Sequence, residues 1–197
     1  MAPTVLTMDR LHLGCGRNTL QGWINLDIIP GEGVDVVADL DACAETPLPF
    51  EDDSIEEFLG VHVLEHLHNP LPLMQELHRI AKPDARAYIT VPYGSSDDAA
   101  EDPTHVRLYY LGSFSYFSQP TYWRADYGYR GDWLVEKIIL RVSEKRYAGK
   151  SAAEIYEEVM HGRNVVVEMT GNLVAVKPAR EPKQELIHRP QIDITLV

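Results

Sequence analysis

The sequence predicts a single α/β domain. Short apolar runs recur along the first half of the chain, and each ends at glycine, aspartate or proline. One segment with helical spacing lies between two of these runs, an order of elements typical of α/β proteins. With 197 residues, of which 45% are hydrophobic, the chain is long enough to bury one good core.

Five strands and one long helix are expected before residue 93. The strands are expected near residues 10–13, 23–26, 34–38, 57–61 and 86–91. Asn69-Pro70 starts the helix with a capping residue and a proline at the first helical position. The helix ends before Pro83, and its apolar positions are Leu73, Leu77 and Ile80. The link between the first two strands is short for a parallel crossover, so we expect the first helix to be reduced to a turn.

The second half begins with a polar loop, followed by an aromatic cluster. Ten of the 17 aromatic residues lie between Tyr109 and Trp133. This cluster is either a satellite core or a lid over an acceptor pocket, two interpretations that are compatible. We expect a sixth strand at 134–142, a Ser-capped helix at 151–160, and β structure at 164–168 and 173–176, as a hairpin or as one strand. The domain is expected to span residues 1–178, with a lid or acceptor region at about 93–133 and a loosely packed tail at 179–197.

Composition limits the partners and the compartment. The net charge of −12 makes nucleic acid a poor partner. Two cysteines suit a reducing compartment rather than a disulfide framework. No signal-like start and no apolar run near the ~18 residues of a membrane span is present. We therefore expect a cytoplasmic protein that is not bound to a membrane.

The stretch Leu11–Gly16 carries the first functional signal. An apolar run stops at Gly14-Cys15-Gly16, and Asp27 follows at the end of the next apolar run. Glycines allow close approach of a ligand to the backbone, and a carboxylate at a strand end can accept both ribose hydroxyls. The third glycine of a dinucleotide motif is replaced by Thr19, and the acid comes earlier than the usual ~20 residues. These features favour a cofactor with ribose but without phosphate.

Several motifs together resemble class I methyltransferases that use S-adenosylmethionine (SAM). The motifs are Leu13–Gly16, Gly22–Asp27, Asp35–Leu40, Leu48–Ile55, His62–Leu67 and Leu77–Pro83, and together they lie within residues 10–93. The resemblance implies a Rossmann-like, seven-stranded, mostly parallel sheet in the order 3-2-1-4-5-7-6. It also implies helices on both faces and an antiparallel last strand.

The resemblance implies SAM, and its product S-adenosylhomocysteine, as the cofactor pair. The implied cofactor-binding residues are Gly14, Cys15, Gly16, Asp27, Ile28, Asp39, Leu40 and His62. Gly14 and Gly16 would approach the methionine part, and Asp27 would hold the ribose hydroxyls. Asp39 with Leu40 would face the adenine amino group, and His62 would line the methionine end. The chain departs from the family at the missing third glycine and at Pro83-Asp84-Ala85, where Pro-Gly-Gly is usual.

The segment His62-Val63-Leu64-Glu65-His66 matches a zinc-protease pattern. That pattern needs a long helix, whereas here a strand ends at Val61 and Pro70 follows soon after. We therefore reject a protease and expect no resident metal. A different metal role for His62, His66, His68 or His105 stays open.

The acceptor loop is expected after the fifth strand. His105 is the candidate general base for an alcohol or phenol acceptor, because histidine titrates near neutral pH. An equally weighted alternative is that His105 only braces the loop. Arg107 is a candidate clamp for an acidic acceptor, and Tyr93 would border the reacting methyl group. His66, with Glu65, would begin the helix after the fourth strand and line the site.

The sequence thus predicts a SAM-dependent methyltransferase that acts on a small molecule, such as a sugar or a natural-product precursor. One alternative is a protein or RNA methyltransferase, which a basic strip near residues 124–146 would support. Another is a SAM-binding module without catalysis. A homodimer stays open.

Overall fold

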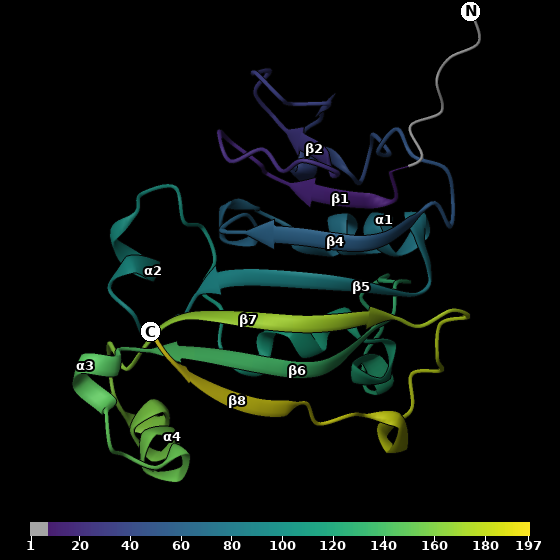
Figure 1. Cartoon of the computed structure of the whole chain (residues 1–197). Coiled ribbons are helices and arrows are strands. Elements are labelled where there is room, and N and C mark those ends of the chain that lie inside the picture. Colours follow the sequence, from purple (N-terminus) through teal and green to yellow (C-terminus); the bar gives the residue numbers. More distant parts are fainter. Residues whose placement is uncertain (1–7) are drawn as a thin grey trace, which may run out of the picture.

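The computed structural model describes residues 8–197, whose strands form one eight-stranded sheet (Figure 1). The strands are β1 Arg10–Leu13, β2 Ile24–Asp27, β3 Val36–Val37, β4 Ile55–Val61, β5 Ala81–Pro92, β6 Trp133–Val142, β7 Val166–Ala175 and β8 Gln191–Leu196. Their spatial order is β3-β2-β1-β4-β5-β7-β6-β8. The predicted order of the first seven strands is therefore confirmed.

Strand β7 is the antiparallel strand of the sheet. It pairs antiparallel with both β5 and β6, whereas β1, β2, β3, β4 and β5 pair in parallel. Because β7 runs unbroken through Gly171, the hairpin alternative for this segment is wrong. Gly171 lies opposite both Ile89 and Ile138, and a Cβ there would stand 2.8 Å from the Phe114 ring. The glycine thus lets the aromatic cluster pack directly on the strand.

The chain after Pro178 is more ordered than the sequence suggests. Residues 191–196 form β8, which pairs in parallel with β6 from Lys137↔Gln191 to Val142↔Leu196. The expectation of a loosely packed tail is therefore wrong, because the tail supplies an edge strand of the sheet. Its side chains are mostly polar or half-exposed, which is usual for an edge strand and hides its pairing from a sequence reading.

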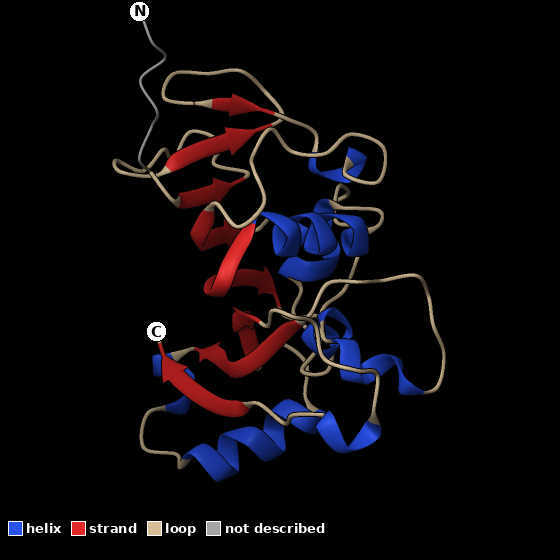
Figure 2. Ribbon diagram, turned by 90° about the vertical axis from the view of Figure 1, so that its right-hand side faces the viewer, coloured by secondary structure: helices blue, strands red, loops and turns tan. Residues whose placement is uncertain are grey.

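The helices gather mainly on one side of the sheet (Figure 2). Helix α1, Pro70–Ile80, is capped by Asn69 and buries its apolar stripe, as predicted. The other helices are α2 Asp98–Glu101, α3 Glu144–Tyr147 and α4 Ala152–His161, with 3-10 helices η1 Leu40–Ala42, η2 Leu64–His66, η3 Ser113–Phe117, η4 Gln119–Trp123 and η5 Gln184–Leu186. In both views α4 lies beyond the β6–β8 end of the sheet.

No helix joins β1 to β2 or β2 to β3. The first helix is reduced to a turn, as expected, because residues 14–23 are too few for a helical crossover, and the same holds for residues 28–35. The buried Asn25 side chain organises the first connection instead. Its oxygen accepts from the backbone N–H of Leu20 at 2.8 Å, and its amide donates to the carbonyls of Leu20 and Trp23.

The aromatic segment between β5 and β6 is a second part of the core. The rings of Phe114, Phe117, Tyr129 and Trp133 are buried. The indole nitrogen of Trp133 donates to the carbonyl oxygen of Met74 in α1 at 2.9 Å, which joins this segment to the main core. These rings belong to the same buried cluster as the strands and α1, so the segment extends the main core and is not a separate satellite. In the described part of the chain, no helix is long and apolar enough to cross a membrane.

Candidate functional site

The glycine turn after β1 lies beside the carboxyl end of β2. Gly14 and Gly16 have φ of +57° and +52°, a region that glycine adopts without strain. A Cβ on Gly14 would stand 2.5 Å from the Val63 side chain, so close packing requires glycine there. A Cβ on Gly16 would meet nothing within 4 Å. The turn therefore borders open space at Gly16.

The Asp27 carboxylate faces this turn. Its Oδ2 accepts from the backbone N–H of Gly16 at 2.7 Å, and its Oδ1 accepts from that of Ile29 at 3.0 Å. A carboxylate has about four acceptor positions, so both oxygens keep capacity for further donors. The neighbouring Ile28 side chain is 59% exposed and offers an apolar surface beside the carboxylate.

Asp39, Leu40 and Cys15, the other residues predicted to bind the cofactor near β1 and β2, support the local structure. Asp39 caps η1, because its Oδ1 accepts from the backbone N–H of Asp41 at 2.9 Å. Leu40 is buried beneath it. The Cys15 N–H donates to the carbonyl of Leu26 at 3.0 Å, and burial raises the pKa of the Cys15 thiol. The thiol therefore stays protonated and is not a nucleophile at neutral pH.

His62 follows β4 in a left-handed conformation, with φ of +54°. Its Nδ1 lies 3.2 Å from Glu65 Oε1, and its Nε2 lies 3.0 Å from Glu168 Oε2. The hydrogen bond to Glu65, followed by the other contacts to the two carboxylates, raises the pKa of His62 against the effect of burial. A strained backbone is retained where the surroundings enforce it, and such residues cluster at functional sites.

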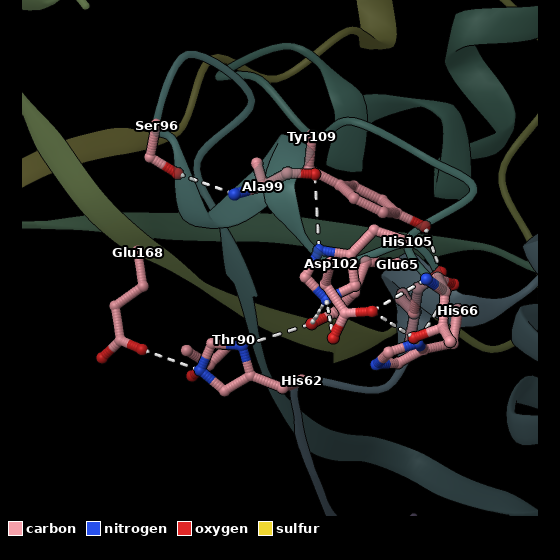
Figure 3. A network of polar contacts seen from close by, with 12 residues as sticks. His62, Glu65, His66, Thr90, Ser96, Ala99, Asp102, His105, Tyr109 and Glu168 are labelled. Atoms are coloured by element: carbon pink, nitrogen blue, oxygen red, sulfur yellow. Dashed lines mark hydrogen bonds and ion pairs between the residues drawn. The ribbon is translucent and has the colours of Figure 1, made fainter. Parts of the chain in front are cut away.

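Glu65 is the centre of a buried polar cluster (Figure 3). It is only 1% exposed, and its Oε1 lies 4.0 Å from His105 Nε2. The rings of His66 and His105 meet edge to face, with centroids 4.8 Å apart. The His105 side chain is 9% exposed, and its Nδ1 lies 3.3 Å from the carbonyl oxygen of Ala99. The structure therefore brings His105 to the residues that follow β4.

The side chains of Arg107 and Tyr93 are both held by contacts within the protein. Arg107 Nε donates to the carbonyl of Leu67 at 3.1 Å, and Nη2 donates to that of His68. Arg107 therefore braces the chain before α1, and these two donors are not free to clamp an acceptor. The buried Tyr93 ring packs edge to face on Tyr110 at 5.6 Å, and burial raises the pKa of Tyr93.

Glu168 belongs to the group of polar side chains around His62, and the sequence analysis did not identify it. It lies in β7, 106 residues after His62, and its other carboxylate oxygen accepts from Arg141 at 2.6 Å. Nothing in the local pattern of β7 marks this glutamate, because only the insertion of β7 beside β5 brings it to His62.

A cavity of about 800 Å³ adjoins the segment that follows His105. Its walls are largely aromatic, and they include Tyr109, Tyr110, Tyr116, Phe117, Tyr122 and Tyr127. Asn69 and Arg107 add polar groups at its border. The glycine turn, Asp27 and His105 are not among its lining residues, whereas Val106 and Arg107, which follow His105, are.

Comparisons with known proteins agree with this geometry. Residues 11–89 match the family model of the methyltransferase domain. No curated protein matches the chain. A SAM-dependent methyltransferase from Archaeoglobus fulgidus superposes with a TM-score of 0.58 at 16% identity, covering 84% of this chain and 85% of that one.

Two further solved structures share the fold. A Galdieria sulphuraria protein assigned as a sarcosine dimethylglycine methyltransferase has a TM-score of 0.54 at 14% identity, with coverage of 91% and 81% of the two chains. A methyltransferase solved in complex with the Haloferax volcanii Trm112 methyltransferase activator has a TM-score of 0.51 at 17% identity, with coverage of 86% and 83%. The N-terminal part of the chain thus matches the methyltransferase-domain family, and the chain shares the fold of solved SAM-dependent methyltransferases.

Proposed function

We propose that this methyltransferase acts on a small-molecule acceptor, such as a sugar or a natural-product precursor. The aromatic cavity beside the His105 segment carries this proposal. Its volume of about 800 Å³ falls within the ~300–1,000 Å³ of small-molecule sites, which are mostly apolar with a few polar groups. Residues 106–127 supply most of the cavity's lining, opposite Asn69–Leu71. The 93–133 segment would then serve as a lid as well as part of the core.

The edge formed by β1 to β4 fits SAM. The open space over Gly16, the spare acceptor capacity of Asp27 and the exposed Ile28 suit a ribose with an attached base. In this proposal Asp27 holds the ribose hydroxyls, Asp39 and Leu40 lie at the adenine, and Gly14, Cys15, Gly16 and His62 border the methionine part. SAM supplies an electrophilic methyl group on a good leaving group, so the protein mainly has to orient the acceptor.

His105 would accept the proton of an acceptor hydroxyl. Its Nδ1 faces the carbonyl oxygen of Ala99, which can only accept, so the proton belongs on Nδ1 and Nε2 carries the free lone pair. Nε2 lies 3.8 Å from Asp102 Oδ2 and 4.0 Å from Glu65 Oε1, and these two carboxylates would stabilise the imidazolium that forms. His66 and Tyr93 would position the surrounding loop in this scheme.

A macromolecular substrate has less support. Three of the six basic residues of the 124–146 stretch are paired with carboxylates: Arg130 with Asp126 at 2.8 Å, Lys137 with Asp193 at 2.8 Å and Arg141 with Glu168 at 2.6 Å. These ion pairs halve the number of basic side chains in the strip that are left to bind phosphates. With a net charge of −12, the chain would also repel a polyanion.

The test measures turnover of SAM with a panel of phenols, hydroxylated sugars and their glycosides. Release of S-adenosylhomocysteine is the readout. His105→Ala should lower kcat by about 10²- to 10⁴-fold, the usual contribution of a general base. Its affinity for SAM should stay unchanged. His161→Ala, which changes an exposed histidine at the end of α4, is the matched control. Full activity of His105→Ala would remove His105 as the base, and inactivity on the whole panel with methylation of a protein or RNA would refute the acceptor class.

A further inference from the structure

Three metal-binding side chains meet at the carboxyl edge of the sheet. One donor atom from each of Glu65, His66 and His105 lies within 4.8 Å of the other two (Figure 3). The three residues come from different parts of the chain: η2 supplies Glu65 and His66, and the loop after α2 supplies His105. This combination of two imidazoles and one carboxylate is a common ligand set for divalent transition metals.

Both histidines are held in the form that binds metal. His66 Nδ1 lies 3.2 Å from the carbonyl oxygen of Thr104 and 3.0 Å from its hydroxyl oxygen. That hydroxyl donates to Asp102 at 2.6 Å, so it accepts from His66, and the proton of His66 belongs on Nδ1. The contact of His105 Nδ1 with the carbonyl oxygen of Ala99 likewise places the proton of His105 on Nδ1. In each ring Nε2 keeps its lone pair, and such outer contacts are typical of metal-ligating histidines.

Glu65 supplies an independent indication of a missing ligand. Its side chain is 1% exposed, and Oε1 accepts from His62. Within residues 8–197, Oε2 is buried without any hydrogen-bond partner. An unpartnered carboxylate oxygen in a protein interior is costly, so such an atom calls for an ion, a proton or water.

We propose that Glu65, His66 and His105 bind one divalent transition-metal ion, through a carboxylate oxygen of Glu65 and Nε2 of each histidine. Tetrahedral donors about 2.0–2.1 Å from an ion lie roughly 3.4 Å apart, so the three side chains have to draw together by small rotations. Three protein ligands leave one tetrahedral position for a water or hydroxyl ligand. Neither cysteine belongs to this cluster, which favours a borderline ion such as Zn²⁺ over a thiolate-seeking one.

The metal site stands on this geometry and not on the proposed acceptor. It does use the same His105 Nε2 that is proposed as the base. One lone pair cannot bind an ion and accept a proton together, so Zn²⁺ should inhibit an enzyme that works through His105 as its base.

The experiment is titration of chelator-treated full-length protein with Zn²⁺ by calorimetry and with Co²⁺ by visible absorption. We expect saturable binding of one ion per chain, with the absorption bands of bound Co²⁺. His66→Ala and His105→Ala should each weaken binding by at least ~10-fold, since loss of an outer contact alone costs ~10- to 100-fold. His161→Ala should bind like the wild type. Thermal melting of each variant shows whether it is folded.

Two results would overturn the site: no saturable binding, or equal affinity of His66→Ala, His105→Ala and His161→Ala. If Glu65→Gln does not fold, the two histidine variants still decide the question. Turnover with added Zn²⁺ tests the base separately. Stoichiometric binding that activates the enzyme would support the metal site and overturn His105 as the base.

Discussion

At the scale of single residues, Asp27 has two tasks in one side chain. Its oxygens hold the backbone N–H groups of Gly16 and Ile29, which shapes the glycine turn, and they keep acceptor capacity toward the open space. A hydrogen bond to a charged group contributes about 1.5–3 kcal/mol. The carboxylate is therefore the side chain on which we expect SAM affinity to depend most.

Asp27→Ala should weaken SAM binding by about 100-fold, because two hydroxyl contacts are lost and the turn loosens. Calorimetric titration with S-adenosylhomocysteine measures this effect without turnover. Glu185→Ala, at an exposed carboxylate in η5, controls for the change in net charge. Equal affinity of the two variants would refute the ribose assignment.

At the scale of elements, the first connection shows how a polar side chain replaces a helix. Asn25 accepts from Leu20, donates to Leu20 and Trp23, and lies 3.3 Å from His12 Nδ1. Asp35 joins the network by accepting from the Asn25 backbone N–H at 2.8 Å. The connection that includes Gly16 is therefore held in place by the hydrogen bonds of Asn25.

Asn25→Ala should lower the free energy of unfolding by about 2–3 kcal/mol, because several buried partners lose their hydrogen bonds at once. Urea denaturation measures the change. Asn18→Ala, at an exposed position of the same turn, should cost less than about 0.5 kcal/mol. A similar small loss in both variants would show that the network is not needed for the turn.

At the scale of the whole molecule, one buried ion pair joins the aromatic segment to the chain after β7. Asp132 is fully buried, and its two oxygens accept from Arg180 Nε and Nη2, each at 2.8 Å. The backbone N–H of Gln119 donates to the same carboxylate at 3.1 Å. This pair holds the segment before β6 and the segment that leads to β8 against each other.

Arg180→Met should destabilise the protein by about 3 kcal/mol, since removal of one partner leaves a buried charge without its counter-ion. Arg189→Met, at an exposed arginine, should stay within ~0.5 kcal/mol of the wild type by the same denaturation measurement. A loss for Arg180→Met no larger than the ~1 kcal/mol of a surface pair would contradict the prediction.

Sequence reasoning worked where the signal is local. The Asn69 cap and Pro70 predict the start of α1, and the spacing of Leu73 to Ile80 predicts its buried face. The glycine turn and the position of Asp27 were also predicted correctly, because a strand end and the turn that follows it depend on residues close together in the chain. Strand β8 was missed, since its pairing depends on β6 rather than on its own composition.

The sequence by itself indicated the methyltransferase resemblance and the strand–turn–acid arrangement around Gly16 and Asp27, because these follow from short motifs. Through that resemblance it also predicted the order of the first seven strands. Only the tertiary structure decided that Glu168 reaches His62 and that Glu65, His66 and His105 share one buried cluster. It also decided that Arg107 supports the backbone. These contacts join residues far apart in the chain. They exist only because the sheet places the carboxyl ends of its strands at one edge and excludes water from Glu65.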